Sequence, residues 1–90
     1  MGMVKGRYMQ LLYFGAPWCG PCKTMKPIIG ALAGKHKIPI VFYDIETDVD
    51  MAIQYIIYTV PTIIKICPEG EIGRISGMQN AYTLESFIRE

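Results

Sequence analysis

Several features that place chains in specialised classes are missing from these 90 residues. No apolar run approaches the roughly 18 residues that span a bilayer, and no repeat, linker or low-complexity tract divides the chain. The net charge is only +1 and the basic residues are scattered, which excludes the basic surface typical of nucleic-acid-binding proteins. Disorder is excluded as well, because 51% of the residues are hydrophobic. We therefore expect a single small domain, residues 1–90, that is a monomer and binds neither membrane nor nucleic acid.

The N-terminal segment lacks the features of an export signal. Lys5 and Arg7 precede an apolar stretch, 8–16, that superficially resembles a short signal peptide. However, Gln10 interrupts this stretch and no small-residue cleavage site follows it. Cleavage would also remove what reads as the central strand. We expect a cytoplasmic protein.

Cysteine is scarce and its count is odd, whereas a secreted disulfide scaffold normally has an even set. Cys19 and Cys22 enclose the dipeptide Gly20-Pro21, and Cys67 stands alone. A CxxC pair with one further cysteine, in a chain without an export signal, indicates redox or metal chemistry. Cys67 itself is expected to be a small buried hydrophobic residue at a strand end.

The apolar pattern predicts seven elements in the order β-α-β-α-β-β-α. Near-continuous apolar runs at 9–14 and 39–45 are typical of parallel strands covered on both faces, and strands at 62–67 and 71–76 are joined by a turn. Helices are predicted over 19–34, from 47 to about 57, and from 83 onward. This order gives an α/β fold with a four-stranded mixed sheet flanked by three helices.

The helix over 19–34 carries the clearest pattern. Its apolar residues form one stripe at helical spacing, namely Met25, Ile28, Ile29, Leu32 and Ala33. Gly34 is expected to end the helix, and Pro27 to kink it. His36 is expected to face solvent near the end of the helix.

The helical register separates the two cysteines of the pair. Cys22 falls on the buried stripe, whereas Cys19 lies at the first turn, where free backbone N–H groups and the helix dipole stabilise a thiolate. Pro21 suits that turn because its missing N–H would have no partner. Cys19 is therefore predicted to attack a substrate disulfide, and Cys22 to resolve the mixed disulfide that results.

Two motifs resemble the hallmarks of the thioredoxin family. The run WCGPCK, which begins at Trp18, is similar to the active-site sequence of thioredoxins. Val60, Pro61 and Thr62 resemble the second hallmark, a cis-proline that faces the cysteines. Gly77 matches the family's glycine near the substrate groove. The resemblance extends from residue 9 to the C-terminus. It implies that Val60, Pro61, Thr62 and Gly77 bind substrate.

The resemblance also implies a function. It indicates a minimal thioredoxin fold, close to the short thioredoxin-like and glutaredoxin-like proteins. It further implies a thiol–disulfide oxidoreductase that reduces protein disulfides through a reversible Cys19–Cys22 disulfide, without a cofactor or metal. Electrons would come from a reductase or a low-molecular-weight thiol. Two alternatives remain open, a glutaredoxin-like electron donor, for example to ribonucleotide reductase, and a non-catalytic binding subunit with the same fold.

One departure from the family pattern concerns the resolving thiol. Thioredoxins usually carry a buried acid six residues before the first cysteine, and that position is Tyr13 here. The position of the acid's usual lysine partner is Phe42. Because a phenol with a pKa of about 10 is a poor base at neutral pH, we expect Cys22 to lose its proton with the help of water or not at all, which slows resolution.

Two further interpretations concern residues outside the pair. The cysteines could be half of a zinc site completed by His36 and Cys67, although the spacings match no zinc pattern. A shallow apolar groove for an extended substrate segment is favoured over scattered surface hydrophobic residues. The residues expected to line this groove are Pro17, Trp18, Ile57, Tyr58 and Met78.

Overall fold

The computed structural model describes residues 9–90 as seven elements in the expected order. Lys5, Arg7 and the start of the apolar stretch considered as an export signal lie outside the described residues. The elements are β1 (Gln10–Gly15), α2 (Gly20–Lys35), β2 (Ile40–Asp44), α3 (Val49–Gln54), β3 (Thr62–Cys67), β4 (Gly70–Ser76) and α4 (Ala81–Arg89).

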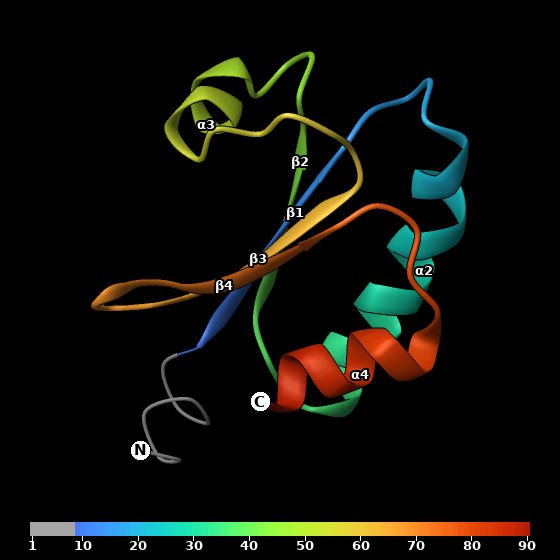
Figure 1. Ribbon diagram of the computed structural model, residues 1–90, viewed down its shortest axis with the longest axis vertical. Helices are drawn as coiled ribbons and strands as arrows, with labels where there is room; N and C mark the ends of the chain where they lie inside the picture. The colour runs from blue at the N-terminus through green and yellow to red at the C-terminus, as the bar shows by residue number, and fades with distance from the viewer. Residues whose placement is uncertain (1–8) are drawn as a thin grey trace.

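The four strands form one mixed sheet in the order β2-β1-β3-β4 (Figure 1). β1 runs parallel to β2 and antiparallel to β3, and β3 and β4 form an antiparallel hairpin. The α/β fold with a mixed sheet and three helices is therefore confirmed. β1 lies between two neighbours, which explains why four of its residues in succession are apolar and buried.

Alternate residues of β1 contribute to two separate cores. Leu11 and Tyr13 belong to the larger core, which the sheet forms with α2 and α4 and which also contains both cysteines of the pair. Leu12 and Phe14 point to the opposite face, where residues of α3 and of the segments beside it pack. Figure 1 shows α2 and α4 together on one side of the sheet and α3 apart from them. The cysteine pair thus lies where α2 meets the end of β1.

Helix ends differ from the sequence expectation because local hydrogen bonds decide them. Gly34 does not end α2, which continues through Lys35. The left-handed residue after the helix is Lys37, with φ of 56°, and the Ile38 N–H donates to the Ala33 carbonyl at 2.8 Å. Helix α4 begins before residue 83, because the Asn80 side chain accepts the Thr83 N–H at 2.8 Å and caps it. Helix α3 ends at Gln54 rather than near Ile57.

A buried lysine, which the apolar pattern of β3 did not suggest, supports the end of α4. Lys65 is 3% exposed, and its Nζ donates to the Phe87 carbonyl at 2.7 Å and lies 4.6 Å from the centre of the Phe87 ring. A cation there satisfies a carbonyl of the last turn and opposes the negative end of the helix dipole. Within residues 9–90, no helix is long and apolar enough to cross a membrane.

Candidate active site

Cys19 and Cys22 form a disulfide across the first turn of α2, with their Cα atoms 5.3 Å apart. Cys19 is the N-cap residue with extended backbone angles, φ −89° and ψ 111°, and Pro21 lies in the first turn. The Cys22 N–H donates to Cys19 Sγ at 3.1 Å, and the first turn contains no acidic residue that would oppose a thiolate. The predicted placement of Cys19 at the helix start and of Cys22 on the buried stripe is confirmed.

The second motif lies against the same core as the disulfide. The Val60–Pro61 peptide bond is cis, as the resemblance implied, and Val60 packs against the core that holds both cysteines. The Gly77 N–H donates to the Pro61 carbonyl at 2.8 Å, which fixes the start of the β4–α4 connection beside the proline. Thr62 is buried and its hydroxyl donates to the Thr59 carbonyl at 2.7 Å. The two motifs are therefore brought together at the core that contains Cys19 and Cys22.

The residues expected to line an apolar groove differ in their exposure. Trp18, Tyr58 and Met78 are 65%, 90% and 54% exposed, so large apolar surface is available in these segments. Ile57 was wrongly assigned to the groove: it packs on the second core, and the neighbouring Ile56, with φ of 54°, is exposed instead. The sequence also did not reveal that the Trp18 indole N–H donates to Glu46 at 2.6 Å.

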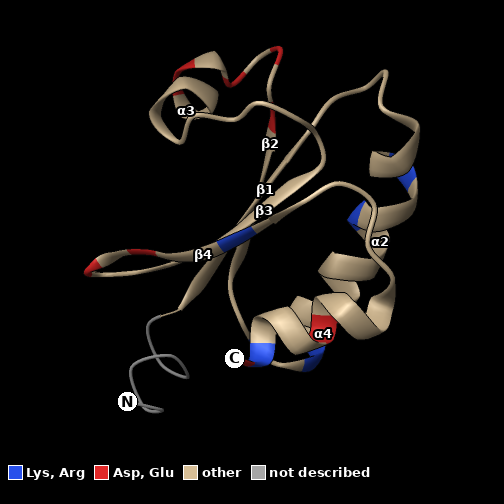
Figure 2. Ribbon diagram, in the orientation of Figure 1, with Lys and Arg blue, Asp and Glu red and all other residues tan. Residues whose placement is uncertain are grey.

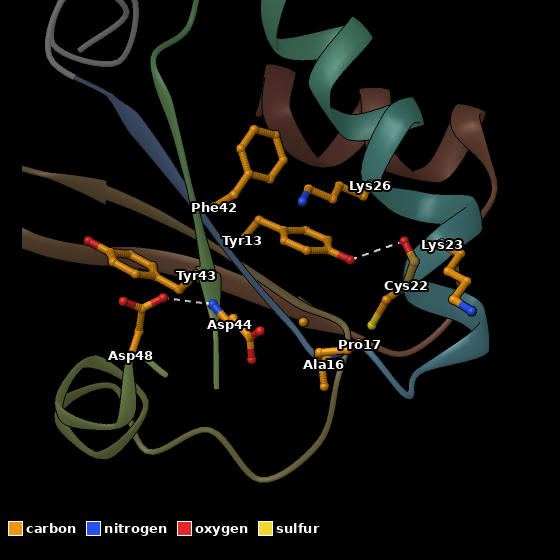
Figure 3. A pocket seen from close by; sticks show the side chains of 11 residues that line it. Tyr13, Ala16, Pro17, Cys22, Lys23, Lys26, Phe42, Tyr43, Asp44 and Asp48 are labelled. Atoms are coloured by element: carbon orange, nitrogen blue, oxygen red, sulfur yellow. Dashed lines mark hydrogen bonds between the residues drawn. The ribbon is translucent and has the colours of Figure 1, made fainter. Parts of the chain in front are cut away.

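Tyr13 occupies the space beneath the pair and is tied to it. The side chain is 2% exposed, and its hydroxyl donates to the Cys22 carbonyl at 3.2 Å (Figure 3). Its ring packs against Phe42 with centroids 5.5 Å apart and folds over Gly15. Burial raises the pKa of Tyr13 above its usual value of 10.0. Because the hydroxyl is a hydrogen-bond donor with a raised pKa, it is unsuited to removing a proton from Cys22.

A cavity of about 340 Å³ lies beside Cys22, between α2 and the carboxyl end of β2 (Figure 3). The residues that line it are Tyr13, Gly15, Ala16, Pro17, Cys22, Lys23, Lys26, Phe42, Tyr43, Asp44 and Asp48. Lys26 Nζ lies 5.3 Å from the centre of the Phe42 ring. Sequence reasoning missed the charged members of this set. The only signal for Asp44 was its place at the carboxyl end of a parallel strand, where α/β proteins often form sites.

The remaining candidate residues lie elsewhere. Cys67 is half-exposed rather than buried, because it is at the end of the β3–β4 hairpin, and its thiol donates to Glu69 at 3.2 Å. His36 is half-buried rather than solvent-facing, with Nε2 2.7 Å from Glu85 of α4. Across residues 9–90, no group of three or more His, Cys, Asp or Glu side chains is arranged to hold a metal ion.

Comparisons with known proteins agree on one family. The thioredoxin family model matches residues 3–90. A thioredoxin of Echinococcus granulosus is 34% identical over 79 residues, which cover 87% of this chain and 74% of that protein. The mitochondrial thioredoxin of Mus musculus is 32% identical over 79 residues, 86% of this chain but only 48% of that protein. The chain thus spans about half the length of the mitochondrial relatives.

Solved structures give the same result for the fold. The crystal structure of Fasciola hepatica thioredoxin superposes with a TM-score of 0.83 at 29% identity. The superposition covers 90% of this chain and 78% of that one. The similarity therefore extends to nearly all of the chain.

Proposed function

The chain belongs to the thioredoxin family, and we propose that it is a thiol–disulfide oxidoreductase that reduces protein disulfides through Cys19 and Cys22. The observation that carries this proposal is the Cys19–Cys22 disulfide at the N-terminus of α2, in the core against which Val60 of the cis Val60–Pro61 bond packs. A cysteine pair at a helix N-terminus is an arrangement suited to reversible electron transfer, because the helix start favours the thiolate form of Cys19.

The reaction runs in two exchange steps. In the reduced protein, the Cys19 thiolate attacks one sulfur of a substrate disulfide, a Cys19–substrate disulfide forms, and the other substrate sulfur leaves as a thiolate. Cys22 then loses its proton and attacks Cys19 Sγ, so that the Cys19–Cys22 disulfide forms and the second substrate sulfur leaves. The substrate gains two electrons, which a reductase or a low-molecular-weight thiol returns to the protein.

Substrate binding is assigned to the residues around the cis-proline. We infer that an extended segment of the substrate lies along Val60 and pairs with its backbone, since edge backbone groups bind extended chains in this way. Pro61, Thr62 and Gly77 would hold that strand end in place, because Thr62 is hydrogen-bonded to Thr59 and the Gly77 N–H to the Pro61 carbonyl.

Single-cysteine variants test the roles of the pair. All of them carry Cys67→Ser, because Cys67 is a half-exposed free thiol that would form disulfides of its own. Cys22→Ser should trap a protein substrate as a covalent adduct, because Cys19 still attacks and nothing resolves the product. Cys19→Ser is the matched control and should trap none. Trapping by Cys19→Ser alone would overturn the assignment.

The electron source and location are part of the same proposal. Insulin reduction with dithiothreitol, followed by trials with a thioredoxin reductase or with glutathione, separates a thioredoxin from a glutaredoxin-like donor and from a non-catalytic subunit. A cytoplasmic location is also a proposal, since relatives of this chain include mitochondrial proteins. Immunoblotting of fractionated cells tests it.

A further inference from the structure

The proposed reaction requires a proton acceptor for Cys22, and the structure excludes the nearest candidate. Cys22 is 5% exposed, and the cavity that it lines is the route by which water can reach it. Tyr13, the polar side chain bonded to its backbone, donates to the Cys22 carbonyl and has a raised pKa. A general base must instead lie within reach of Cys22 directly or through water. The cavity beside Cys22 is the place to look for it.

Asp44 shares that cavity with Cys22. It is the last residue of β2 and pairs with Gly15 of β1, which also lines the cavity and has no side chain to fill it. Figure 3 shows Asp44 and Cys22 among the residues around this space. A volume of about 340 Å³ exceeds what several water molecules need, and the lining supplies polar partners for them.

Each of the two carboxylates of the cavity accepts one backbone N–H. Asp48 Oδ2 accepts the Asp44 N–H at 2.9 Å. Asp44 Oδ1 accepts the Glu46 N–H at 2.8 Å, so one oxygen of each carboxylate takes no part in these two bonds. Asp44 is also the carboxylate that is paired in register with Gly15, beside the cysteine pair. Asp44 is therefore the better placed of the two.

Charged side chains of both signs line the cavity. Lys23 and Lys26 of α2 line it from one side, and Asp44 and Asp48 line it from the other. Figure 2 shows the same separation on a larger scale, with basic residues along α2 and acidic residues at the end of β2 and around α3.

We propose that Asp44 accepts, through water in this cavity, the proton that Cys22 loses during resolution. In this step the Cys22 thiol gives its proton to a cavity water, which passes one proton to the Asp44 carboxylate. The Cys22 thiolate attacks Cys19 Sγ, the Cys19–Cys22 disulfide forms, and the substrate sulfur leaves as a thiolate. The protonated Asp44 then releases its proton through the cavity to solvent. The inference rests on the proposed oxidoreductase function and assigns a role to a residue outside both motifs.

A two-phase reaction separates attack from resolution. Reduced protein carrying Cys67→Ser is mixed rapidly with 5,5′-dithiobis(2-nitrobenzoate), and thionitrobenzoate absorbance is followed. Attack by Cys19 releases the first equivalent and resolution by Cys22 releases the second. Asp44→Asn keeps an oxygen for the Glu46 N–H and should leave the first phase unchanged, but slow the second about tenfold or more at neutral pH. Asp48→Asn, which removes the other cavity carboxylate, should leave both phases unchanged.

Chemical rescue distinguishes proton transfer from a structural effect. Formate is small enough for the cavity and should restore the second phase of Asp44→Asn in proportion to its concentration, with no effect on the parent protein. Asp44→Ser provides a second variant if Asp44→Asn fails to fold.

Three outcomes would overturn the inference while the proposed function stands: an unchanged second phase in Asp44→Asn, equal slowing in Asp48→Asn, or slowing that formate does not relieve. If the parent protein shows no first phase, the proposed function fails and the inference falls with it.

Discussion

Substitution of Gly15 tests the packing beneath the cysteine pair. A Cβ at this position would lie 2.8 Å from Tyr13 Cε1, 3.0 Å from its hydroxyl oxygen and 3.2 Å from Cζ. Non-bonded carbon atoms normally lie about 3.5–4.0 Å apart, so an added methyl group overlaps the ring. The ring cannot move aside freely because it is 2% exposed and bonded to Cys22. Gly15→Ala should therefore destabilise the protein.

Two opposing contributions set the magnitude. Overpacking of a tight core costs roughly 1–3 kcal/mol. Replacement of Gly by Ala at a compatible backbone stabilises by about 0.4–1 kcal/mol, because it restricts the unfolded chain. The net effect of Gly15→Ala should be a loss of about 1–2 kcal/mol of the free energy of unfolding. In a Tyr13→Val background the three contacts are gone, and the same substitution should become neutral or stabilising by up to about 1 kcal/mol.

The assay is urea unfolding of four oxidised proteins, namely the parent protein, Gly15→Ala, Tyr13→Val and the variant with both substitutions. At an m-value of roughly 1 kcal/mol/M, the loss corresponds to a midpoint lower by about 1–2 M. Equal costs of Gly15→Ala with and without the Tyr13 ring would refute the reasoning, since the cost would then not come from this contact.

Two further predictions concern pH and catalysis. Hydrogen bonds, above all from Lys35, lower the pKa of Glu85 from 4.5 to about 2, so its stabilisation is present above pH 4.5 and is lost as pH falls toward 2. The free energy of unfolding should fall less over this range in Glu85→Gln, and an unchanged pH profile would contradict the assignment. Tyr13→Asp places a carboxylate beneath Cys22 and should speed insulin reduction by dithiothreitol. An unchanged or lower rate of insulin reduction, in a variant that folds normally, would count against the idea that proton loss from Cys22 limits the reaction.

Local sequence patterns were sufficient for most of the fold. Apolar spacing placed the strands and α2 to within a few residues, because one buried stripe or face repeats at the period of its element. The helix ends that were misplaced depend on single hydrogen bonds. The Asn80 cap began α4 two residues early, and Lys37 rather than Gly34 took the left-handed position after α2. Such choices depend on which neighbouring group supplies the last hydrogen bond, and periodicity does not report it.

Part of the site was equally local and part was not. The order Cys19 before Cys22 on a helix start follows from register, so the N-cap position of Cys19 and the position of Cys22 inside the helix could be predicted. Ile57, by contrast, was assigned to the surface when Ile56 lies there, because one residue with positive φ reverses which side chain faces inward. Cys67 was expected inside because β3 is apolar, yet its hairpin end leaves it half-exposed.

The sequence by itself determined that two cysteines share one helix start, because both belong to a single continuous segment whose register is fixed by its apolar stripe. Only the tertiary structure decided what surrounds them. Asp44 is 22 residues from Cys22 in the chain, and the pairing of β2 with β1 brings it to the same cavity. The sequence shows that Tyr13 stands where the family usually has an acid, but the hydrogen bond from Tyr13 to Cys22 depends on how α2 packs across β1. Contacts between segments follow from packing and pairing, which no single segment encodes.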